Sequence, residues 1–199
     1  KCSTFKPLGR VRVPWYRLGN RVGTGLVRNR TGPGRVSYDE VKREPEMSHS
    51  VAILDIADVT HNVRRYTLER PEGYVFKPGQ ATEVSLDEEG WRDRKHPFTF
   101  TGYGDAPTLE FTIKSYFNTG EDGMTERLYG YEPGQRLIIR DVWGTITYQG
   151  GPGTFVAGGA GVTPFIAILR DLNRRGDMAG NTLVDSNRTV SDIILISDD

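Results

Sequence analysis

Residues 95–125 read KHPFTFTGYGDAPTLEFTIKSYFNTGEDGMT, and this stretch decides the fold class. It holds two short segments, 96–103 and 108–117, that are rich in Thr, Ile, Phe and Tyr. Such residues favour extended strands, and the Gly, Asp and Pro between the segments favour a tight connection. The stretch therefore predicts two neighbouring strands of an antiparallel sheet.

Similar strand-like runs lie on both sides of this stretch. They are VAILDIADVT (51–60), VRRYTLERP (63–71), ATEVSLDEE (81–89) and QRLIIRDVWG (135–144). Only MTERLYGY (124–131) breaks the series, because Met124, Leu128 and Tyr131 have the spacing of one helix face. Many short strands separated by turns are typical of a barrel or sandwich. We expect residues 47–148 to form an antiparallel β-barrel with one small helix.

The pattern changes after residue 150. TFVAGG (154–159) predicts a buried strand, VTPFIAILRDLNRRG (162–176) a helix with Pro164 in its first turn, and NTLVDS (181–186) a second strand. Strand–helix–strand is how a parallel α/β sheet begins, and such a sheet normally has more strands than two or three. We expect residues 149–199 to form a partial α/β lobe.

Charge separates a leader from the remaining chain. Residues 1–46 contain eleven Lys or Arg and four Asp or Glu, whereas residues 47–199 contain fifteen and twenty-two. The leader has no apolar periodicity and no secretory-signal core. We expect it to be disordered; a basic arm for an anionic partner is the alternative.

The whole composition excludes several classes of protein. The acidic body argues against nucleic-acid binding, and Cys2, the single cysteine, excludes an internal disulfide or a multi-cysteine zinc site. No apolar run approaches the ~20 residues of a membrane span. We expect a cytoplasmic protein without a metal site.

Three segments carry candidate ligand-binding residues, each with a purely structural alternative. Phe98 and Thr99 offer an aromatic face and a hydroxyl to a flat cofactor, or belong to an ordinary strand. Lys114 and the start of the helix at 124 suit a diphosphate, or are a solvated strand end and a helix cap. The Gly-rich turn 158–164 suits a nucleotide phosphate, or serves tight strand–helix packing.

The order of these segments carries a resemblance. His-Pro-Phe-Thr (96–99), Ile-Lys-x-Tyr (113–116), Gly-Met-Thr (123–125) and Gly-Gly-x-Gly-x-Thr-Pro (158–164) follow one another. Together they resemble the ferredoxin–NADP reductase superfamily, especially flavodoxin-reductase-like enzymes, over residues 50–196. The resemblance implies an FAD-binding barrel of the ferredoxin-reductase type, followed by a lobe that binds NADPH or NADH.

The resemblance also implies residue roles in the barrel. Phe98 would stack on the isoalloxazine ring, and Thr99 would lie near its reactive nitrogen as a catalytic residue. His96, followed by Pro97, stands where the family has an Arg for the FAD diphosphate, so this contact would be weaker and pH-dependent. The remaining expected FAD contacts are Ile113, Lys114, Tyr116, Gly123, Met124 and Thr125.

In the lobe the resemblance assigns the nucleotide to the Gly-rich turn. Gly159, Gly161, Thr163 and Pro164 would approach the nicotinamide nucleotide, with Thr163 as the second catalytic candidate. Asp185 would suit the ribose of NADH, whereas Ser186 and Arg188 would suit the 2′-phosphate of NADPH, which we favour. A carboxylate at position 185 would be costly in the centre of a sheet.

The implied function is transfer of a hydride from NAD(P)H to FAD and then of electrons to a protein carrier. The carrier would be a flavodoxin, a ferredoxin, a haem protein or an oxygenase. The flavin supplies the chemistry, so no catalytic acid–base pair is required. The alternative is a flavin-binding or protein-docking module without turnover.

Overall fold

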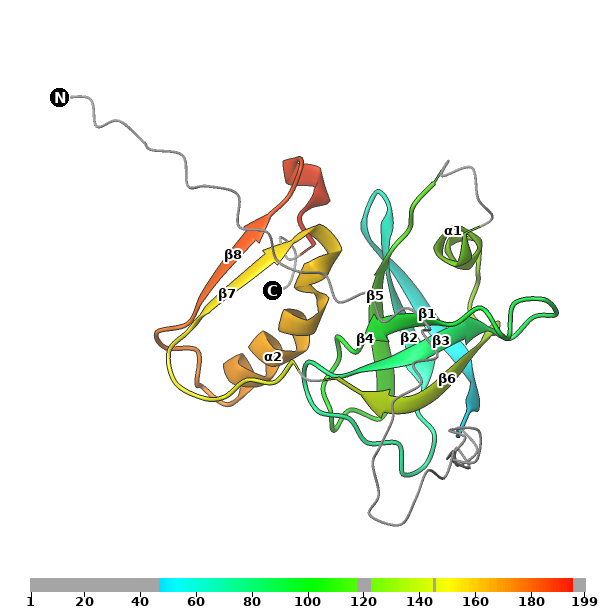
Figure 1. Cartoon of the computed structure of the whole chain (residues 1–199), viewed down its shortest axis with the longest axis horizontal. Helices are drawn as coiled ribbons and strands as arrows, with labels where there is room; N and C mark the ends of the chain where they lie inside the picture. The colour runs from blue at the N-terminus through cyan, green and yellow to red at the C-terminus, as the bar shows by residue number, and fades with distance from the viewer. Residues whose placement is uncertain (1–46, 118–122, 145, 195–199) are drawn as a thin grey trace, which may run out of the picture. The chain divides into compact units, whose positions relative to one another are not determined.

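The computed structural model describes residues 47–117, 123–144 and 146–194, all within one compact unit of the chain. The expectations for the leader at 1–46 lie outside the described residues. The first part consists of six strands and one helix, which are labelled in Figure 1. They are β1 (His49–Thr60), β2 (Val63–Glu69), β3 (Ala81–Leu86), β4 (His96–Thr99), β5 (Thr108–Lys114), α1 (Met124–Tyr129) and β6 (Arg136–Trp143).

All neighbouring strands of this sheet run antiparallel, in the order β4-β3-β6-β1-β2-β5. The end strands β4 and β5 approach each other at an isolated bridge between Phe100 and Phe111. The ladder does not continue from there, so the sheet is open rather than a closed barrel. The cause lies partly in β4, which has only four residues and whose Pro97 has no N–H to donate. The predicted antiparallel architecture is otherwise confirmed.

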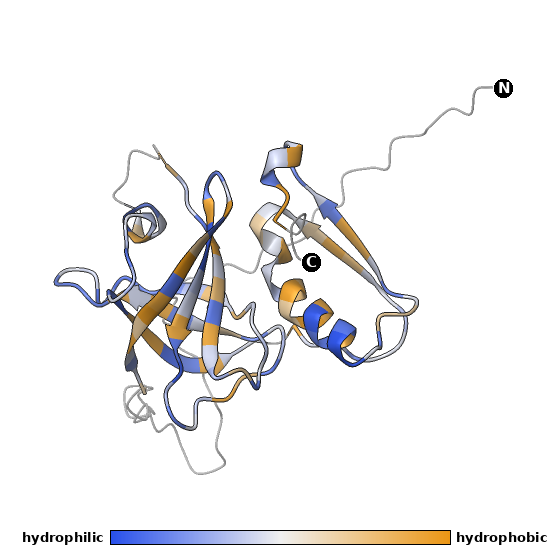
Figure 2. Cartoon of the chain, turned by 180° about the vertical axis from the view of Figure 1, so that it is seen from behind, coloured by the Kyte–Doolittle hydropathy of each residue, from blue (hydrophilic) through white to orange (hydrophobic). Residues whose placement is uncertain are grey.

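The core of the sheet is aromatic. The rings of Phe76 and Phe100 are stacked with centroids 4.1 Å apart, and Phe100 stacks on Phe111 at 4.9 Å. Leu109, Phe111 and Ile113 alternate along β5 and are fully buried, as expected for a strand with one face inside. The apolar and polar stretches of the strands are visible in Figure 2. This packing fixes the position of β5, whose last residues line the cavity described below.

Helix α1 is short but firmly packed. Met124 and Leu128 lie four residues apart on one face and are buried in the core, together with Tyr131. The Tyr131 hydroxyl donates to Glu88 Oε1 at 2.6 Å, which ties the segment after α1 to the loop that follows β3. The helix predicted from the 124–131 pattern is confirmed, and its N-terminus is held next to β5.

The α/β part contains β7 (Thr154–Gly158), the 3₁₀ turn η2 (Gly159–Val162), α2 (Thr163–Arg174), β8 (Thr182–Ser186) and the 3₁₀ turn η3 (Val190–Asp192). Strands β7 and β8 pair in parallel. Pro164 occupies the first turn of α2, and Gly176, with a φ of +74°, follows its end. The predicted strand–helix–strand order is confirmed. Among the described residues, no helix is long and apolar enough to span a bilayer.

Candidate functional site

Four separate segments of the chain meet around one cavity of about 530 Å³. Strand β4, the end of β5, the start of α1 and the junction of η2 with α2 each contribute to its wall. The lining residues are His96, Pro97, Phe98, Thr99, Thr112, Ile113, Lys114, Tyr116, Gly123, Met124, Thr125, Ala160 and Thr163. The structure thus brings together all ten residues singled out in the first part of the chain, although 13 positions separate Thr99 from Thr112 and seven separate Tyr116 from Gly123.

Strand β4 contributes an aromatic ring and a hydroxyl. Phe98 and Thr99 are half-buried, and the Phe98 ring lies 6.4 Å from the ring of Phe111 in the core. This packing holds Phe98 in place while part of the ring remains available to a ligand. His96 and Pro97 lie on the same strand but are exposed. An exposed His96 can contact an anion only at the rim of the cavity.

Strand β5 contributes the cation. Lys114 Nζ lies 3.3 Å from Asp192 Oδ1 in η3, and both side chains are largely buried. The same carboxylate accepts from the Thr189 hydroxyl at 2.8 Å. The Thr189 hydrogen bond, followed by that from Lys114, lowers the pKa of Asp192. Asp192 is therefore ionised at neutral pH and places a negative charge next to Lys114 beside the cavity.

The start of α1 faces the cavity with backbone groups. Gly123, Met124 and Thr125 line it, and among the described residues no side chain caps this helix. Ser115 Oγ donates to Thr125 O at 2.9 Å and so joins the end of β5 to the helix. Tyr116, next to Ser115, lines the cavity and is 55% exposed.

The Gly-rich turn leaves room for a close approach. A Cβ atom placed on Gly159 or Gly161 would meet nothing within 4 Å, and Gly159 has a φ of +53°. Thr163 begins α2, and its hydroxyl donates to Ala160 O at 3.0 Å. Thr163 lines the cavity, but Gly159, Gly161 and the buried Pro164 do not. The turn therefore presents open backbone beside the cavity rather than part of its wall.

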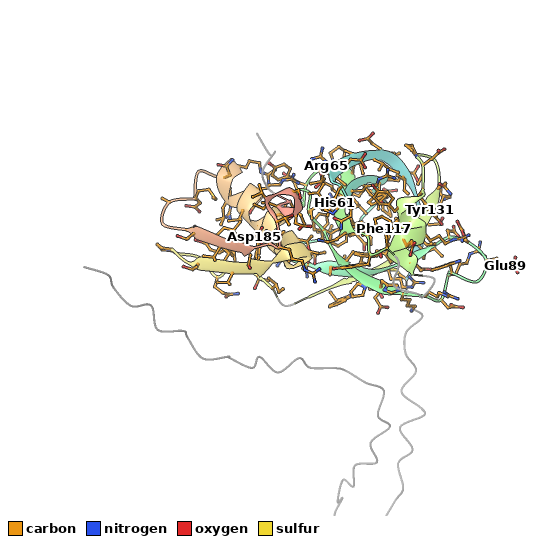
Figure 3. All side chains as sticks on the ribbon, turned by 90° about the horizontal axis from the view of Figure 1, so that it is seen from above. His61, Arg65, Glu89, Phe117, Tyr131 and Asp185 are labelled. Atoms are coloured by element: carbon orange, nitrogen blue, oxygen red, sulfur yellow. The ribbon has the colours of Figure 1, made fainter. Side chains whose placement is uncertain are left out.

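The carboxyl ends of β7 and β8 lie side by side, with Gly158 opposite Ser186. Ser186 and Arg188 are exposed and do not line the cavity. Asp185, labelled in Figure 3, is half-buried and accepts from Asn187 Nδ2 at 2.8 Å. Its Oδ1 is buried without a hydrogen-bond partner among the described residues. The candidates for the nucleotide ribose thus gather at the strand ends, where α/β sheets commonly bind ligands.

The sequence interpretation missed three residues of this region. Thr112 lines the cavity, and its spacing of two from Lys114 could have placed it on the same strand face. Ala160 lines it as well, next to the glycines of the turn. Asp192 lies 78 residues after Lys114, so no local pattern could have indicated that ion pair.

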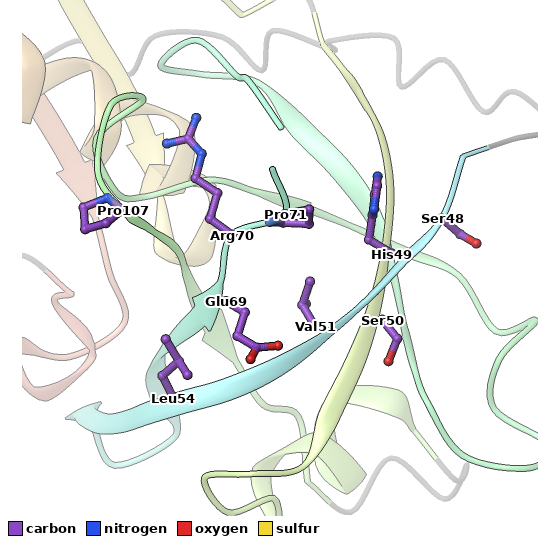
Figure 4. Close-up of a pocket in the computed structure, with 9 residues that line it drawn as sticks. All are labelled: Ser48, His49, Ser50, Val51, Leu54, Glu69, Arg70, Pro71 and Pro107. Carbon is purple, nitrogen blue, oxygen red and sulfur yellow. The ribbon is translucent and has the colours of Figure 1, made fainter. Parts of the chain in front are cut away.

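A second hollow of about 640 Å³ lies at the start of β1 and the end of β2, and Figure 4 shows its lining. Arg70 already donates to Tyr74 O at 2.8 Å and to Ala106 O at 2.7 Å. Glu69 Oε2 accepts from Ala52 N at 2.8 Å. These charges therefore brace the surrounding loops, and the hollow offers less chemistry than the first cavity. Across the described part of the chain, no group of three His, Cys, Asp or Glu could hold a metal ion.

The curated proteins that match this chain include reductases and dual oxidases, although no family model matches it. The chain is 27% identical over 131 residues to the reductase component of propane 2-monooxygenase from Rhodococcus jostii, covering 64% of this chain and 34% of that protein. It is 26% identical over 223 residues to NADH-cytochrome b5 reductase 2 from Aspergillus oryzae, covering 98% and 65%. The chain spans about a third to a half of the length of the first curated relatives it matches.

Solved structures give the same result for the fold. A ferredoxin–NADP⁺ reductase from Neisseria gonorrhoeae with bound FAD and NADP matches 74% of this chain and 60% of its own, with a TM-score of 0.63 and 21% identity. The expected resemblance to the ferredoxin–NADP reductase superfamily is confirmed at the level of the fold.

Proposed function

We propose, from the premise that this chain has the fold of the ferredoxin–NADP reductases, that it is part of an NAD(P)H-dependent FAD oxidoreductase. The observation that carries the proposal is the single cavity formed by β4, β5, the start of α1 and the start of α2. It unites an aromatic ring, hydroxyl groups, a cation and the backbone at a helix start, and these groups suit the flat ring and the diphosphate of a flavin dinucleotide.

The residues present fit FAD. We assign the isoalloxazine to Phe98 and Thr99 and the ribityl and diphosphate groups to Ile113, Lys114 and Tyr116, with the backbone of Gly123, Met124 and Thr125. The cofactor would supply two-electron uptake from a nicotinamide and stepwise electron release to an acceptor. Lys114 would offset the diphosphate charge, although it must share its charge with Asp192. His96 would add a contact at the rim.

The lobe would bring the nucleotide to the flavin. Gly159 and Gly161 leave open space at the turn, so the nucleotide backbone could lie directly on theirs. Thr163 stands both at the start of α2 and in the cavity wall, where it would orient the nicotinamide towards Thr99. Ser186 and Arg188, at the end of β8, would meet the ribose end; both can donate to a 2′-phosphate, which favours NADPH.

The electron acceptor would be another protein. The names of the relatives point to oxygenase components and cytochrome b5 as acceptors of their reductases. We extend this to a protein carrier such as a flavodoxin, a ferredoxin, a haem protein or an oxygenase.

The test is an anaerobic titration of the purified full chain. We expect it to bind FAD more tightly than FMN, because Lys114 and the start of α1 suit a diphosphate. Addition of NADPH or NADH should then bleach the flavin absorbance between about 350 and 500 nm. A chain that takes up neither flavin under these conditions would contradict the proposal.

A further inference from the structure

We infer that Arg170 is a positioning residue: it holds α2 on β5 so that Thr163 faces the flavin pocket. This inference rests on the proposed function and concerns residues that the sequence did not single out. Within α2, Arg170 and Arg174 lie seven and eleven positions after Thr163. At 3.6 residues per turn these separations are close to two and three full turns, so all three lie on one helix face.

The Arg170 guanidinium joins that face to the sheet. Its Nη1 donates to Thr101 O at 2.9 Å and to Glu110 Oε1 at 2.7 Å. The side chains of Arg170 and Glu110 are only 22% and 20% exposed. Little water screens this ion pair, so it is stronger than a pair on the open surface.

A second ion pair on the same helix face, between Arg174 and Asp105, is weaker than that of Arg170. Arg174 binds both oxygens of Asp105, at 2.7 and 2.9 Å, and lies 4.6 Å from the centre of the Tyr103 ring. Asp105 is 68% exposed, however, and exposed pairs contribute little to stability. Arg170 is therefore the main polar connection between α2 and the sheet on this face.

On the sheet side, the connection continues to the cavity wall. Glu110 Oε1 also accepts from the Thr101 hydroxyl at 2.8 Å, and Thr101 Oγ1 lies 3.1 Å from Thr112 Oγ1. Thr101 and Thr112 are both buried, and Thr112 lines the cavity. Glu110, Thr112 and Lys114 alternate along one face of β5. On this face Glu110 binds Arg170 at one end and Lys114 binds Asp192 at the other. Thr112, between them, is part of the cavity wall.

Different elements therefore position the flavin and the nicotinamide. The side chains assigned to the flavin come from β4, β5 and α1, which are also held by the strand ladders and by the main hydrophobic core. Thr163 belongs to α2, and Arg170 is the main polar connection that holds α2 on β5. Loss of Arg170 should displace the nicotinamide relative to the flavin without preventing FAD from binding. A displacement of about 1 Å at a reacting centre can slow a reaction by about 100-fold.

The first test needs no cofactor. Hydrogen exchange of the ligand-free full chain should be roughly tenfold faster over the amides of residues 163–174 in Arg170→Met than in the unchanged protein. Arg175→Met is the matched control, because Arg175 follows directly after α2 and its partner among the described residues is Asp171, four residues earlier. Equal exchange in Arg170→Met and the unchanged protein would overturn the inference, whatever the protein does with flavin.

The second test separates positioning from binding. In Arg170→Met we expect FAD affinity within about twofold of the unchanged protein, flavin reduction 10- to 100-fold slower, and a weaker charge-transfer absorbance between nicotinamide and flavin. Arg170→Lys should recover part of the rate, because it keeps one charged donor. An unchanged rate in Arg170→Met would overturn the inference while the proposed function stands. Failure of the unchanged protein to bind FAD would instead remove the proposed function.

Discussion

Replacing Phe98 by Ala removes the one phenyl ring that β4 offers to the cavity among its described lining residues. The proposed function assigns this ring to the isoalloxazine. Stacking of a planar heterocycle on an aromatic side chain contributes about 1–3 kcal/mol. Since about 1.4 kcal/mol corresponds to a factor of ten, FAD affinity should fall roughly 5- to 150-fold.

The same substitution also affects folding, and this effect has to be separated from binding. Phe98 is half-buried and packs on the core near Phe111. Full loss of a buried Phe costs about 3–5 kcal/mol, so a half-buried ring should cost about 2 kcal/mol. In a protein of this size that lowers the Tm by about 4–8 °C. Binding must therefore be measured well below the Tm of the variant.

The assay is a calorimetric titration of ligand-free protein with FAD, on Phe98→Ala and two controls. Phe98→Tyr keeps the ring and should bind FAD nearly as well as the unchanged protein. Phe155→Ala removes another half-buried ring, which lies in β7 with its centroid 5.3 Å from that of Phe165. It should lose stability without losing FAD affinity. If Phe98→Ala binds FAD as tightly as Phe155→Ala does, the assignment of the isoalloxazine to Phe98 is refuted.

Three further predictions address the rim of the cavity, the acid sensitivity and the Gly-rich turn. His96→Arg should tighten FAD binding at pH 8 by roughly 3- to 10-fold, because a permanent cation replaces a histidine at the exposed rim; equal affinities in titrations at pH 8 would show that His96 does not meet the diphosphate. The Tyr131 hydroxyl and, secondarily, Arg127 lower the pKa of Glu88, so its contribution to stability is present above its unfolded pKa of about 4.3 and is lost as the pH falls through the lowered value. Between pH 6 and pH 3, the free energy of unfolding measured in urea should thus fall less in Glu88→Gln than in the exposed control Glu89→Gln, and equal decreases would contradict this origin. Gly161→Ala should leave the Tm within about 2 °C, because a Cβ there meets open space, yet slow flavin reduction by NAD(P)H; an unaffected stopped-flow rate would place the nucleotide elsewhere.

Local pattern was sufficient for most of the elements. The alternation along β5 and the i, i+4 spacing of Met124 and Leu128 each reflect burial of one face, which a single segment reveals by itself. Pro164 and Gly176 likewise mark the two ends of α2 through their own backbone preferences. The open end of the sheet could not be predicted in this way, because closure depends on how β4 and β5 meet.

The candidate site was predictable only where its residues are neighbours in sequence. Phe98 with Thr99, and Lys114 with Tyr116, stand out as short motifs. The contacts that organise the site join distant positions: Lys114 with Asp192, and Arg170 with Glu110. A charged residue on an amphipathic helix looks the same in sequence whether it faces water or an acidic partner. Only the packing of α2 against the sheet distinguishes Arg170 from Arg175.

The central claim is that the cavity between β4, β5 and α1 holds FAD and that a nicotinamide nucleotide reaches it. The most direct measurement is an absorption spectrum of the full chain reconstituted with FAD and freed of excess cofactor, recorded anaerobically before and after NADPH or NADH. The account predicts one bound FAD per chain, with a visible band that one of the two nucleotides bleaches. A protein that remains colourless after reconstitution, or a flavin band that neither nucleotide bleaches, would contradict it.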